Sequence, residues 1–214
     1  MVNGLTLDFE PATHTYTVDG KAVPSVTQIV APLGQDYDEP DEMTEIAIDY
    51  AAERGTIMHE YIAHRLGGGE PDVFEIPDEY ADYADGVEQF LAEHSVVPFA
   101  VETPITNAPM VGLEEYYVAG TPDLVCEFDG RLAILDYKFV SSVAKSKVCA
   151  QLGGYLKLCE CNAVYPEALY AVQFKRGDYR LYPVNEADAV RMWNAALNLY
   201  YEKTFKHARG RIGK

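Results

Sequence analysis

The stretch Asp123-Leu-Val-Cys-Glu-Phe-Asp-Gly-Arg-Leu-Ala-Ile-Leu-Asp-Tyr-Lys138 decides which fold this chain is expected to adopt. It contains two apolar runs, 124–128 and 131–135, on either side of Asp129-Gly130. Asp-Gly is a preferred dipeptide for the two-residue type I′ turn, because both residues tolerate the positive φ angles that this turn requires. The stretch therefore predicts an antiparallel hairpin in the second half of the chain.

The turn also decides which residues face one another across the hairpin. With a two-residue loop, Phe128 lies opposite Arg131, and the numbers of each further pair sum to 259. Asp123 then lies opposite Asp136, with Cβ atoms about 4.5–5.5 Å apart on one face of the pair. Because side chains alternate along a strand, Lys138 is expected on the same face.

Two opposed carboxylates repel each other, so this pair needs a positively charged partner. Mg²⁺ and Mn²⁺ prefer carboxylate oxygens and would stabilise it. A lysine ammonium beside the pair can orient an attacking water and stabilise charge that grows on a phosphate. The alternative is a surface Asp–Lys pair at a strand end. The independent turn signal favours a metal-dependent hydrolytic site built from Asp123, Asp136 and Lys138.

The rest of the chain alternates between helical and strand patterns. Helices are expected at 44–66, 77–94, 143–161 and 186–205. Strands are expected at 99–106, 116–119, 124–128 and 131–140, with two further hairpins at 16–23 and 169–184. This order predicts one mixed α/β domain (1–214) with a central β-sheet flanked by helices. Its expected parts are an N-terminal hairpin and loop (1–40), a core (44–185) and a C-terminal helix with a basic tail (186–214).

Composition argues against several classes of protein. The chain has 214 residues, of which 48% are hydrophobic, and it contains no apolar run of about 18 residues that would span a membrane. Its first residues lack the basic and apolar regions of a secretory signal, so a cytoplasmic protein is expected. The cysteines show no trusted zinc-binding spacing and are expected to be reduced structural thiols (Cys126, Cys149, Cys159, Cys161).

Charge is distributed unevenly along the chain. The net charge of −17 at first argues against a nucleic-acid partner. Residues 1–130 carry 27 acidic and 3 basic side chains, whereas residues 131–214 carry 14 basic and 7 acidic ones, which gives the second part a net charge of +7. A polyanion could bind that part, but an ordinary solubilising surface would also explain the pattern, so charge alone decides nothing.

Several short motifs around the hairpin resemble one known family in type and order. Gly120-Thr-Pro-Asp123, followed after twelve residues by Asp136-Tyr-Lys138, resembles the signature of the PD-(D/E)XK nuclease superfamily. The chain is most similar to the RecB-like branch, which includes phage recombination exonucleases and CRISPR-adaptation nucleases. Three further motifs support this branch: Gly55-Thr-Ile-Met-His59, Val101-Glu102 and Gln151-Leu-Gly-Gly-Tyr155. The resemblance runs from about residue 13 to residue 156 and implies a restriction-endonuclease-like core.

The resemblance implies a role for each residue of the expected site. His59, Asp123 and Asp136 would bind Mg²⁺ or Mn²⁺, and Glu102 would support a ligand or the attacking water. Lys138 would position that water. By default a helical histidine such as His59 is a surface or core residue, and only the order of the family motifs favours metal binding.

Two positions on the following helix are expected to complete the site. Gln151 and Tyr155 are four residues apart and therefore share a helix face. The resemblance implies that they contact the DNA backbone or the nucleophile. The alternative for Tyr155 is a core aromatic in a stripe with Val148 and Leu152, and one ring can serve both purposes.

The chain departs from the family pattern in two places. Phe139 stands where the family often has Thr or Ser, on the opposite, core-facing side of the strand, which puts a secondary contact in doubt. The cysteines do not match the pattern of members that carry an iron–sulfur cluster, so no cluster is expected. A G-x-x-x-x-G-K-[ST] loop is also missing, so any helicase or recombination partner would be a separate chain.

The expected function is therefore that of a metal-dependent exonuclease. It would act on linear DNA, at ends or on single strands, in phage or prophage recombination or repair. Two alternatives remain open. One is a catalytically silent nuclease-like module that binds DNA or protein, because a fold does not secure a function. The other is an endonuclease or ribonuclease of the same fold.

Overall fold

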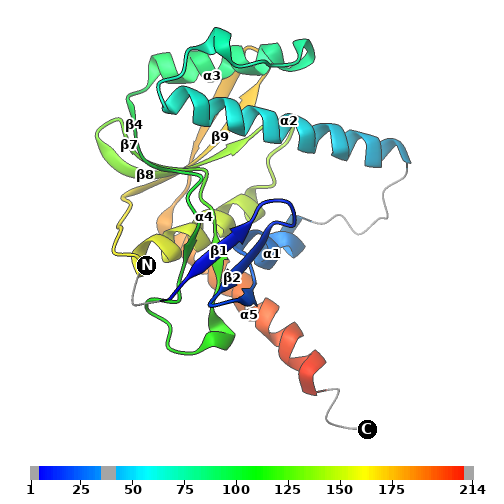
Figure 1. The fold of residues 1–214 in the computed structure, drawn as a ribbon, viewed down its shortest axis with the longest axis vertical. Helices are drawn as coiled ribbons and strands as arrows, with labels where there is room; N and C mark the ends of the chain where they lie inside the picture. Colours follow the sequence, from blue (N-terminus) through cyan, green and yellow to red (C-terminus); the bar gives the residue numbers. More distant parts are fainter. Residues whose placement is uncertain (1–4, 35–41, 210–214) are drawn as a thin grey trace.

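The computed structural model describes residues 5–34 and 42–209. A five-stranded mixed sheet forms its centre, with strands in the order β10-β9-β8-β7-β4. Helices cover both faces of this sheet: α2 and α3 lie above it in Figure 1, and α1, α4 and α5 lie below it. The expected mixed α/β fold with a central sheet flanked by helices is confirmed. None of the helices in the described part of the chain is long and apolar enough to cross a membrane.

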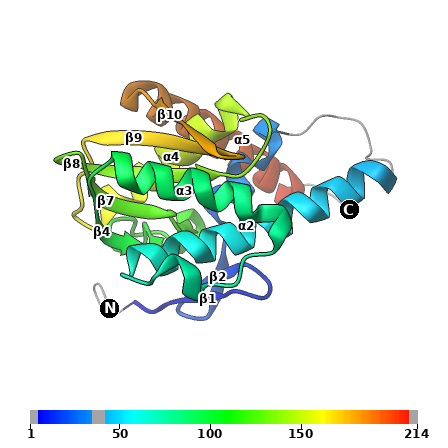
Figure 2. The same cartoon turned by 90° about the horizontal axis from the view of Figure 1, so that it is seen from above.

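The strands of the central sheet lie side by side when the molecule is seen from above (Figure 2). Their bounds are β4 Val96–Val101, β7 Leu124–Phe128, β8 Arg131–Lys138, β9 Ala168–Lys175 and β10 Asp178–Pro183. All neighbours in the sheet are antiparallel except β8 and β9, which are parallel. A parallel pair needs a crossover connection, and α4 (Lys145–Cys161) lies within it.

The central hairpin has the predicted register. Its pairs run from Leu124↔Leu135 to Phe128↔Arg131, so the numbers of each pair sum to 259 as expected. Asp129 and Gly130 both have positive φ, +48° and +82°, as a type I′ turn requires. The hairpin therefore positions the residues at its open end, on either side of the Leu124↔Leu135 pair.

Alternation along β8 sends its side chains to two separate cores. Ala133, Leu135 and Tyr137 pack on the side of α2 (Glu42–Leu66) and α3 (Ala81–Glu93). Ile134 packs on the other side, with α1 (Val26–Val30), α4 and α5 (Glu186–Arg209). A central strand that is covered on both faces reads as an almost continuous apolar run. By the same alternation, Asp136 and Lys138 lie on the α4 face.

The helices agree with the expected ones, with small changes at their ends. The expected helix 77–94 begins as a 3₁₀ turn, η3 (Asp78–Tyr80), and continues as α3. The expected helix 143–161 begins at Lys145, and 186–205 extends to Arg209. A helix that the sequence patterns missed is α1, whose N-cap Ser25 forms a capping box with Gln28. The Ser-x-x-Gln spacing was a usable signal. Two further 3₁₀ turns are η1 (Ala31–Gly34) and η2 (Pro71–Val73).

Two strand predictions were wrong in their bounds. The expected strand 99–106 is two strands, because Glu102 has a φ of +41° and ends β4. The second, β5 (Ile105–Thr106), pairs with β6 (Ala119–Gly120) in a separate two-stranded sheet. Most of the expected strand 116–119 is instead the end of η4 (Glu114–Tyr116) and a loop, where the side chain of Asn107 binds the backbone of Tyr116 and Val118.

The end of β8 also differs from the expected 131–140. The strand stops at Lys138. The carbonyl of the next residue, Phe139, accepts a hydrogen bond from Arg54 Nε at 3.0 Å instead of joining the sheet. A second hydrogen bond, from Arg54 Nη2, goes to the same oxygen. The side chain of Arg54 in α2 thus supplies the hydrogen bonds that a neighbouring strand would otherwise give at the end of β8.

The N-terminal hairpin is confirmed and is larger than expected. β2 (Thr15–Val18) and β3 (Lys21–Val23) flank Asp19-Gly20, and β1 (Leu7–Glu10) adds a third strand that the sequence patterns missed. The expected loop 34–41 lies outside the described residues after Gly34. The same holds for the end of the expected basic tail, 210–214.

Candidate active site

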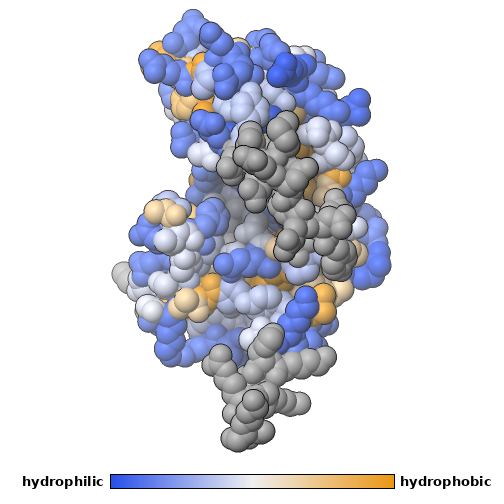
Figure 3. Space-filling view, turned by 90° about the vertical axis from the view of Figure 1, so that its right-hand side faces the viewer, coloured by the Kyte–Doolittle hydropathy of each residue, from blue (hydrophilic) through white to orange (hydrophobic). Residues whose placement is uncertain are grey.

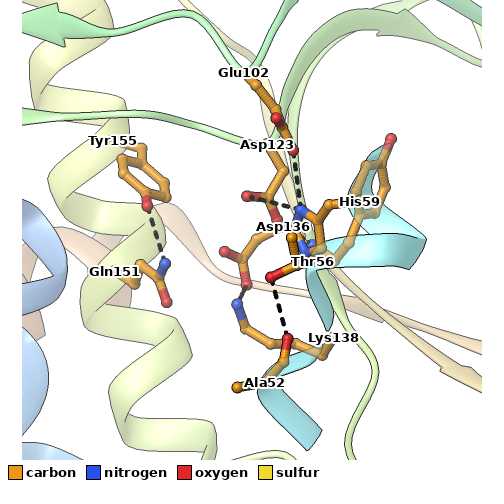
Figure 4. Close-up of polar contacts among 10 residues, drawn as sticks. Ala52, Thr56, His59, Glu102, Asp123, Asp136, Lys138, Gln151 and Tyr155 are labelled. Atoms are coloured by element: carbon orange, nitrogen blue, oxygen red, sulfur yellow. Dashed lines mark hydrogen bonds and ion pairs between the residues drawn. The ribbon is translucent and has the colours of Figure 1, made fainter. Parts of the chain in front are cut away.

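Three neighbouring strands end at one edge of the central sheet and bring together the residues of the expected site. Asp136 and Lys138 are at the end of β8, Asp123 directly precedes β7, and Glu102 directly follows β4. Because β4 and β8 both run antiparallel to β7, these three ends meet. His59 reaches this edge from α2 (Figure 4). Five of the seven predicted site residues therefore lie together.

Asp136 is the most unusual group of this cluster. Its side chain is fully buried, with 0% exposure, and no residue that the structure describes donates a hydrogen bond of good geometry to either carboxylate oxygen. Lys138 Nζ lies 2.5 Å from Asp136 Oδ2. Burial raises the pKa of Asp136 to about 6, although the charge of Lys138 opposes this. Burial lowers the pKa of Lys138, but the negative charges of Asp136 and Asp123 raise it by more. The lysine pKa is therefore above its usual value.

Asp123 faces Asp136 across the open end of the hairpin, as the register predicts. Its Oδ2 accepts a hydrogen bond from the backbone N–H of Tyr137 at 2.6 Å, which continues the pairing beyond Leu124. Its Oδ1 lies 3.8 Å from His59 Nδ1. The negative charge of Asp123 adds to the rise in the pKa of Asp136. Two carboxylates and one ammonium thus share a small, largely buried volume.

His59 connects Asp123 with Glu102. Its Nδ1 lies 3.2 Å from Glu102 Oε1, and its ring packs edge-on against Tyr137 and Phe139. Burial disfavours the protonated ring, but Asp123 and Glu102 outweigh this effect, so the pKa of His59 is raised. Phe139 is only 3% exposed and faces the core, as predicted from the strand alternation.

The backbone of Glu102 is strained. A φ of +41° is unfavourable for a residue with a Cβ, and such strain is typical of functional positions that the surrounding structure holds in place. The backbone N–H of Glu102 donates to the carbonyl of Asp123 at 3.0 Å, which holds this conformation. The strained backbone aims the carboxylate at His59.

Replacing Glu102 by glycine and by alanine separates the strain from the carboxylate. Both variants lose the contact with His59, but only glycine adopts the positive φ at no steric cost. Glu102→Gly is therefore expected to be about 1 kcal/mol more stable to urea unfolding than Glu102→Ala. Equal stability of the two variants would contradict this expectation, because the strain relieved by glycine would then not exceed the extra backbone entropy that glycine loses on folding.

Gln151 and Tyr155 lie on α4, which faces the cluster across the sheet surface (Figure 4). Both are buried, at 6% and 3% exposure, and Gln151 Nε2 donates to the hydroxyl of Tyr155 at 3.0 Å. Within the described residues, no hydrogen bond joins either side chain to Asp136. Tyr155 also packs in the core cluster of α4. The core role expected for this ring is therefore present, and its contact with a substrate stays a prediction.

The chemistry of the donors fits a divalent cation, although their present positions do not form a closed site. Across the described residues, no three His, Cys, Asp or Glu side chains converge to hold a metal ion as they stand. The ammonium of Lys138 lies against Oδ2 of Asp136. The other oxygen of Asp136, Oδ1, is buried and has no hydrogen-bond partner among the described residues. This oxygen, the carboxylate of Asp123 and the ring nitrogen of His59 are donor groups that Mg²⁺ or Mn²⁺ can use.

Arg54 is a residue of this region that the sequence patterns missed. Besides its hydrogen bonds to the carbonyl of Phe139, its guanidinium lies 4.9 Å from the ring centre of Tyr83 in α3. It thereby ties the segment that follows Lys138 to both upper helices. The only signal in the sequence is its place directly before the Gly55–His59 motif, which does not reveal this contact.

Comparisons with known proteins add little to this geometry. No family model matches the chain, and no curated protein matches it in sequence. Among solved structures, the one described as SSO0001 has a TM-score of 0.43 and 16% identity over 83% of this chain and 75% of its own. An alkaline exonuclease from Laribacter hongkongensis (LHK-Exo) has a TM-score of 0.37 and 13% identity over 89% of this chain and 95% of its own. The structure of LHK-Exo in complex with dAMP has a TM-score of 0.34 and 13% identity over 88% of this chain and 94% of its own. With TM-scores below 0.5, these likenesses do not assign a function.

Proposed function

We propose that this protein is a metal-dependent nuclease and that His59, Asp123, Asp136 and Lys138 form its active centre. The observation that carries the proposal is the carboxylate of Asp136, which is fully buried, ion-paired with the ammonium of Lys138 and without a further hydrogen-bond partner among the described residues. Burying such a charge costs several kcal/mol, by an order-of-magnitude estimate, unless a partner compensates it. Perturbed, buried charges of this kind are typical of functional sites.

Each residue of the chain has a separate task in the proposed reaction. His59, Asp123 and Asp136 would hold Mg²⁺ or Mn²⁺, which acts as a Lewis acid and makes a bound water more acidic. Glu102 orients the ring of His59 through the contact at Nδ1. Lys138 has three N–H donors, which can orient the attacking water and stabilise the charge that grows on the phosphate.

The substrate that we propose is linear DNA, with hydrolysis starting from its ends. Support comes from the resemblance to RecB-like exonucleases at five motifs and from the net charge of +7 in residues 131–214, which include the catalytic strand. A cation in the site would also reduce the repulsion between phosphates and the carboxylates. A role in phage or prophage recombination, together with a separate recombination protein or helicase, follows from the same resemblance.

A panel of labelled substrates tests the proposed function. Linear single-stranded DNA, linear and circular double-stranded DNA, and RNA are incubated with the full chain in Mg²⁺ or Mn²⁺ at low salt. We expect shortening of linear DNA in either metal, no cleavage in EDTA, and intact circles. Low salt is chosen because contacts with phosphates weaken steeply as salt rises.

The same panel of substrates distinguishes the alternative functions. Cleavage of circles would identify an endonuclease, and cleavage of RNA alone a ribonuclease. If every substrate stays intact while a gel-shift experiment shows bound DNA, the chain is a binding module with a nuclease-like fold, and the proposed function is wrong.

A further inference from the structure

A cavity with a distinct chemical character lies on the β9 side of the candidate active site. Its volume is about 490 Å³, and it lies between the first turn of α4, the start of α5 and the strands β9 and β10. This size is in the range of pockets that hold small ligands, about 300–1,000 Å³. Figure 3 shows a separate hollow in the surface, below the part with α2 and α3; no residue of these two helices lines the cavity.

The lining of this cavity is basic in a protein with a net charge of −17. Three cations line it: Lys145 at the first turn of α4, Lys175 at the end of β9, and Arg180 in β10. As far as the structure describes the chain, none of them is in an ion pair. Among the lining residues that the structure describes, the single carboxylate, Asp188, lies 2.7 Å from Arg191 and is thus compensated. The cavity is therefore suited to an anion.

On the side of the active centre, the lining of this cavity includes a buried polar side chain, Gln173. Gln173 in β9 is directly paired with Lys138 in the parallel register, so both side chains lie on the same face of the sheet. Gln173 is 2% exposed, and its Nε2 donates to the carbonyls of Val140 and Ser141 at 2.7 and 3.1 Å. It thereby holds the segment that follows Lys138 as a wall of the cavity. A ligand in the cavity lies one strand away from the lysine.

Part of the remaining lining is apolar, and it includes an aromatic ring. Val143, Val148 and Val184 contribute aliphatic surface, and the hydroxyl of Tyr182 is anchored by Gln173 Oε1 at 3.1 Å. Because its hydroxyl is held, the ring of Tyr182 is fixed in place. A fixed ring beside aliphatic groups suits a planar base, and sequence-tolerant stacking of this kind is common in proteins that bind single strands. Cations for a phosphate and an apolar platform for a base thus occur in one cavity.

We propose that this cavity binds one nucleotide of the strand that passes through the active centre. Its phosphate lies among Lys145, Lys175 and Arg180, and its base lies against Tyr182. The proposal rests on the proposed function, because it takes the polymer to be a nucleic acid that reaches Lys138. It adds a binding position on the β9–β10 side of the scissile phosphate. A free nucleoside monophosphate has the same chemistry, so the experiment must distinguish the two sources.

The test measures binding separately from cleavage. A fluorescently labelled 12-nucleotide single strand is titrated with the full chain in EDTA, and anisotropy gives the affinity at several salt concentrations. Lys175→Ala and Arg180→Ala are each expected to weaken binding about tenfold. Each should also lower the slope of log affinity against log salt by about 0.7, because one phosphate contact is lost.

A matched control is available in the turn that joins the two strands. Arg176 is exposed and lies beside Lys175, but it is not part of the cavity lining. Arg176→Ala removes the same charge from the position next to Lys175 and should change the affinity less than twofold. Circular dichroism and the melting temperature of all three variants should equal those of the wild-type chain, because the three side chains reach the surface.

The outcomes separate this inference from the proposed function. If Lys175→Ala and Arg180→Ala bind the strand as well as Arg176→Ala does, or if the wild-type chain binds no strand, the inference is overturned. It is also overturned if only free dAMP binds the cavity, seen as a thermal shift that Arg180→Ala removes. If the variants weaken strand binding but the wild-type chain cleaves nothing, the inference stands and the proposed function fails.

Discussion

Lys138→Ala is expected to slow the cleavage of DNA about 1,000-fold. Removing a group that orients the nucleophile or stabilises charge in the transition state typically costs factors of about 10²–10⁴. Lys138 Nζ is within 2.5 Å of Asp136, at the edge of the sheet where the proposed centre lies. Its side chain is 22% exposed, so the shorter residue leaves no closed cavity in the core. The measurement is the single-turnover rate of shortening of end-labelled linear DNA in Mn²⁺, with enzyme in excess.

Lys157 offers a matched control for this substitution. It lies on α4 in a surface ion pair with Glu160 at 2.7 Å, outside the proposed centre. Lys157→Ala removes the same charge and should leave the rate within about twofold, since exposed pairs of this type contribute little. A Lys138→Ala rate within a few fold of the Lys157→Ala rate would remove the lysine from the mechanism.

Gly153→Ala is expected to lower the free energy of unfolding by about 2–3 kcal/mol, the upper part of the range of about 1–3 kcal/mol for overpacked cores. A Cβ at this position would lie 2.1 Å from the carbonyl oxygen of Ala189 and 3.0 Å from Cβ of Trp193. The backbones of α4 and α5 touch here, so a methyl group forces the helices apart. Trp193 is 4% exposed and belongs to the core below the sheet, which would lose packing along its length. Urea unfolding of the purified variant measures the loss.

Gly112→Ala is the control for this measurement. No atom lies within 4 Å of a Cβ built at Gly112, and its φ is not in the left-handed region. Its stability should stay within about 0.5 kcal/mol of the wild-type value, as is usual for surface positions. If Gly153→Ala unfolded at the same urea concentration as Gly112→Ala, the close approach of α4 and α5 would be wrong.

The hairpin at the centre of the sheet could be predicted because its determinants are local. Asp129-Gly130 specifies the turn, the turn specifies the register, and the register places Asp123 opposite Asp136. Each step depends on neighbours in the chain. The helices were predictable for a similar reason, because their apolar periodicity is contained within one segment.

Features that depend on distant contacts could not be predicted from these patterns. The left-handed backbone of Glu102 ends a strand that its composition would continue, and it is held by the carbonyl of Asp123. Gly153 and Gly154 stand within a motif that the resemblance connects with the active site. In the structure they are also the place where α5 approaches α4. A glycine in a helix does not reveal in advance which of these demands it serves.

The same distinction applies to the candidate site. Asp123, Asp136 and Lys138 followed from one hairpin, whereas the approach of His59 to Glu102 joins residues 43 positions apart. Only the order of the family motifs suggested that contact, because no local pattern connects α2 with the end of β4. The basic cavity beside Gln173 had no motif at all, since its cations come from three different elements.

The most direct test of the central claim is the metal dependence of DNA cleavage by the wild-type chain, with Lys138→Ala beside it. End-labelled linear DNA is incubated with each protein in Mn²⁺ and in EDTA at low salt. We predict shortened products only for the wild-type chain in Mn²⁺, with intact DNA in EDTA and in every reaction of Lys138→Ala. Intact DNA in all reactions, or equal cleavage by both proteins, would contradict the assignment of Asp123, Asp136 and Lys138 as the active centre of a nuclease.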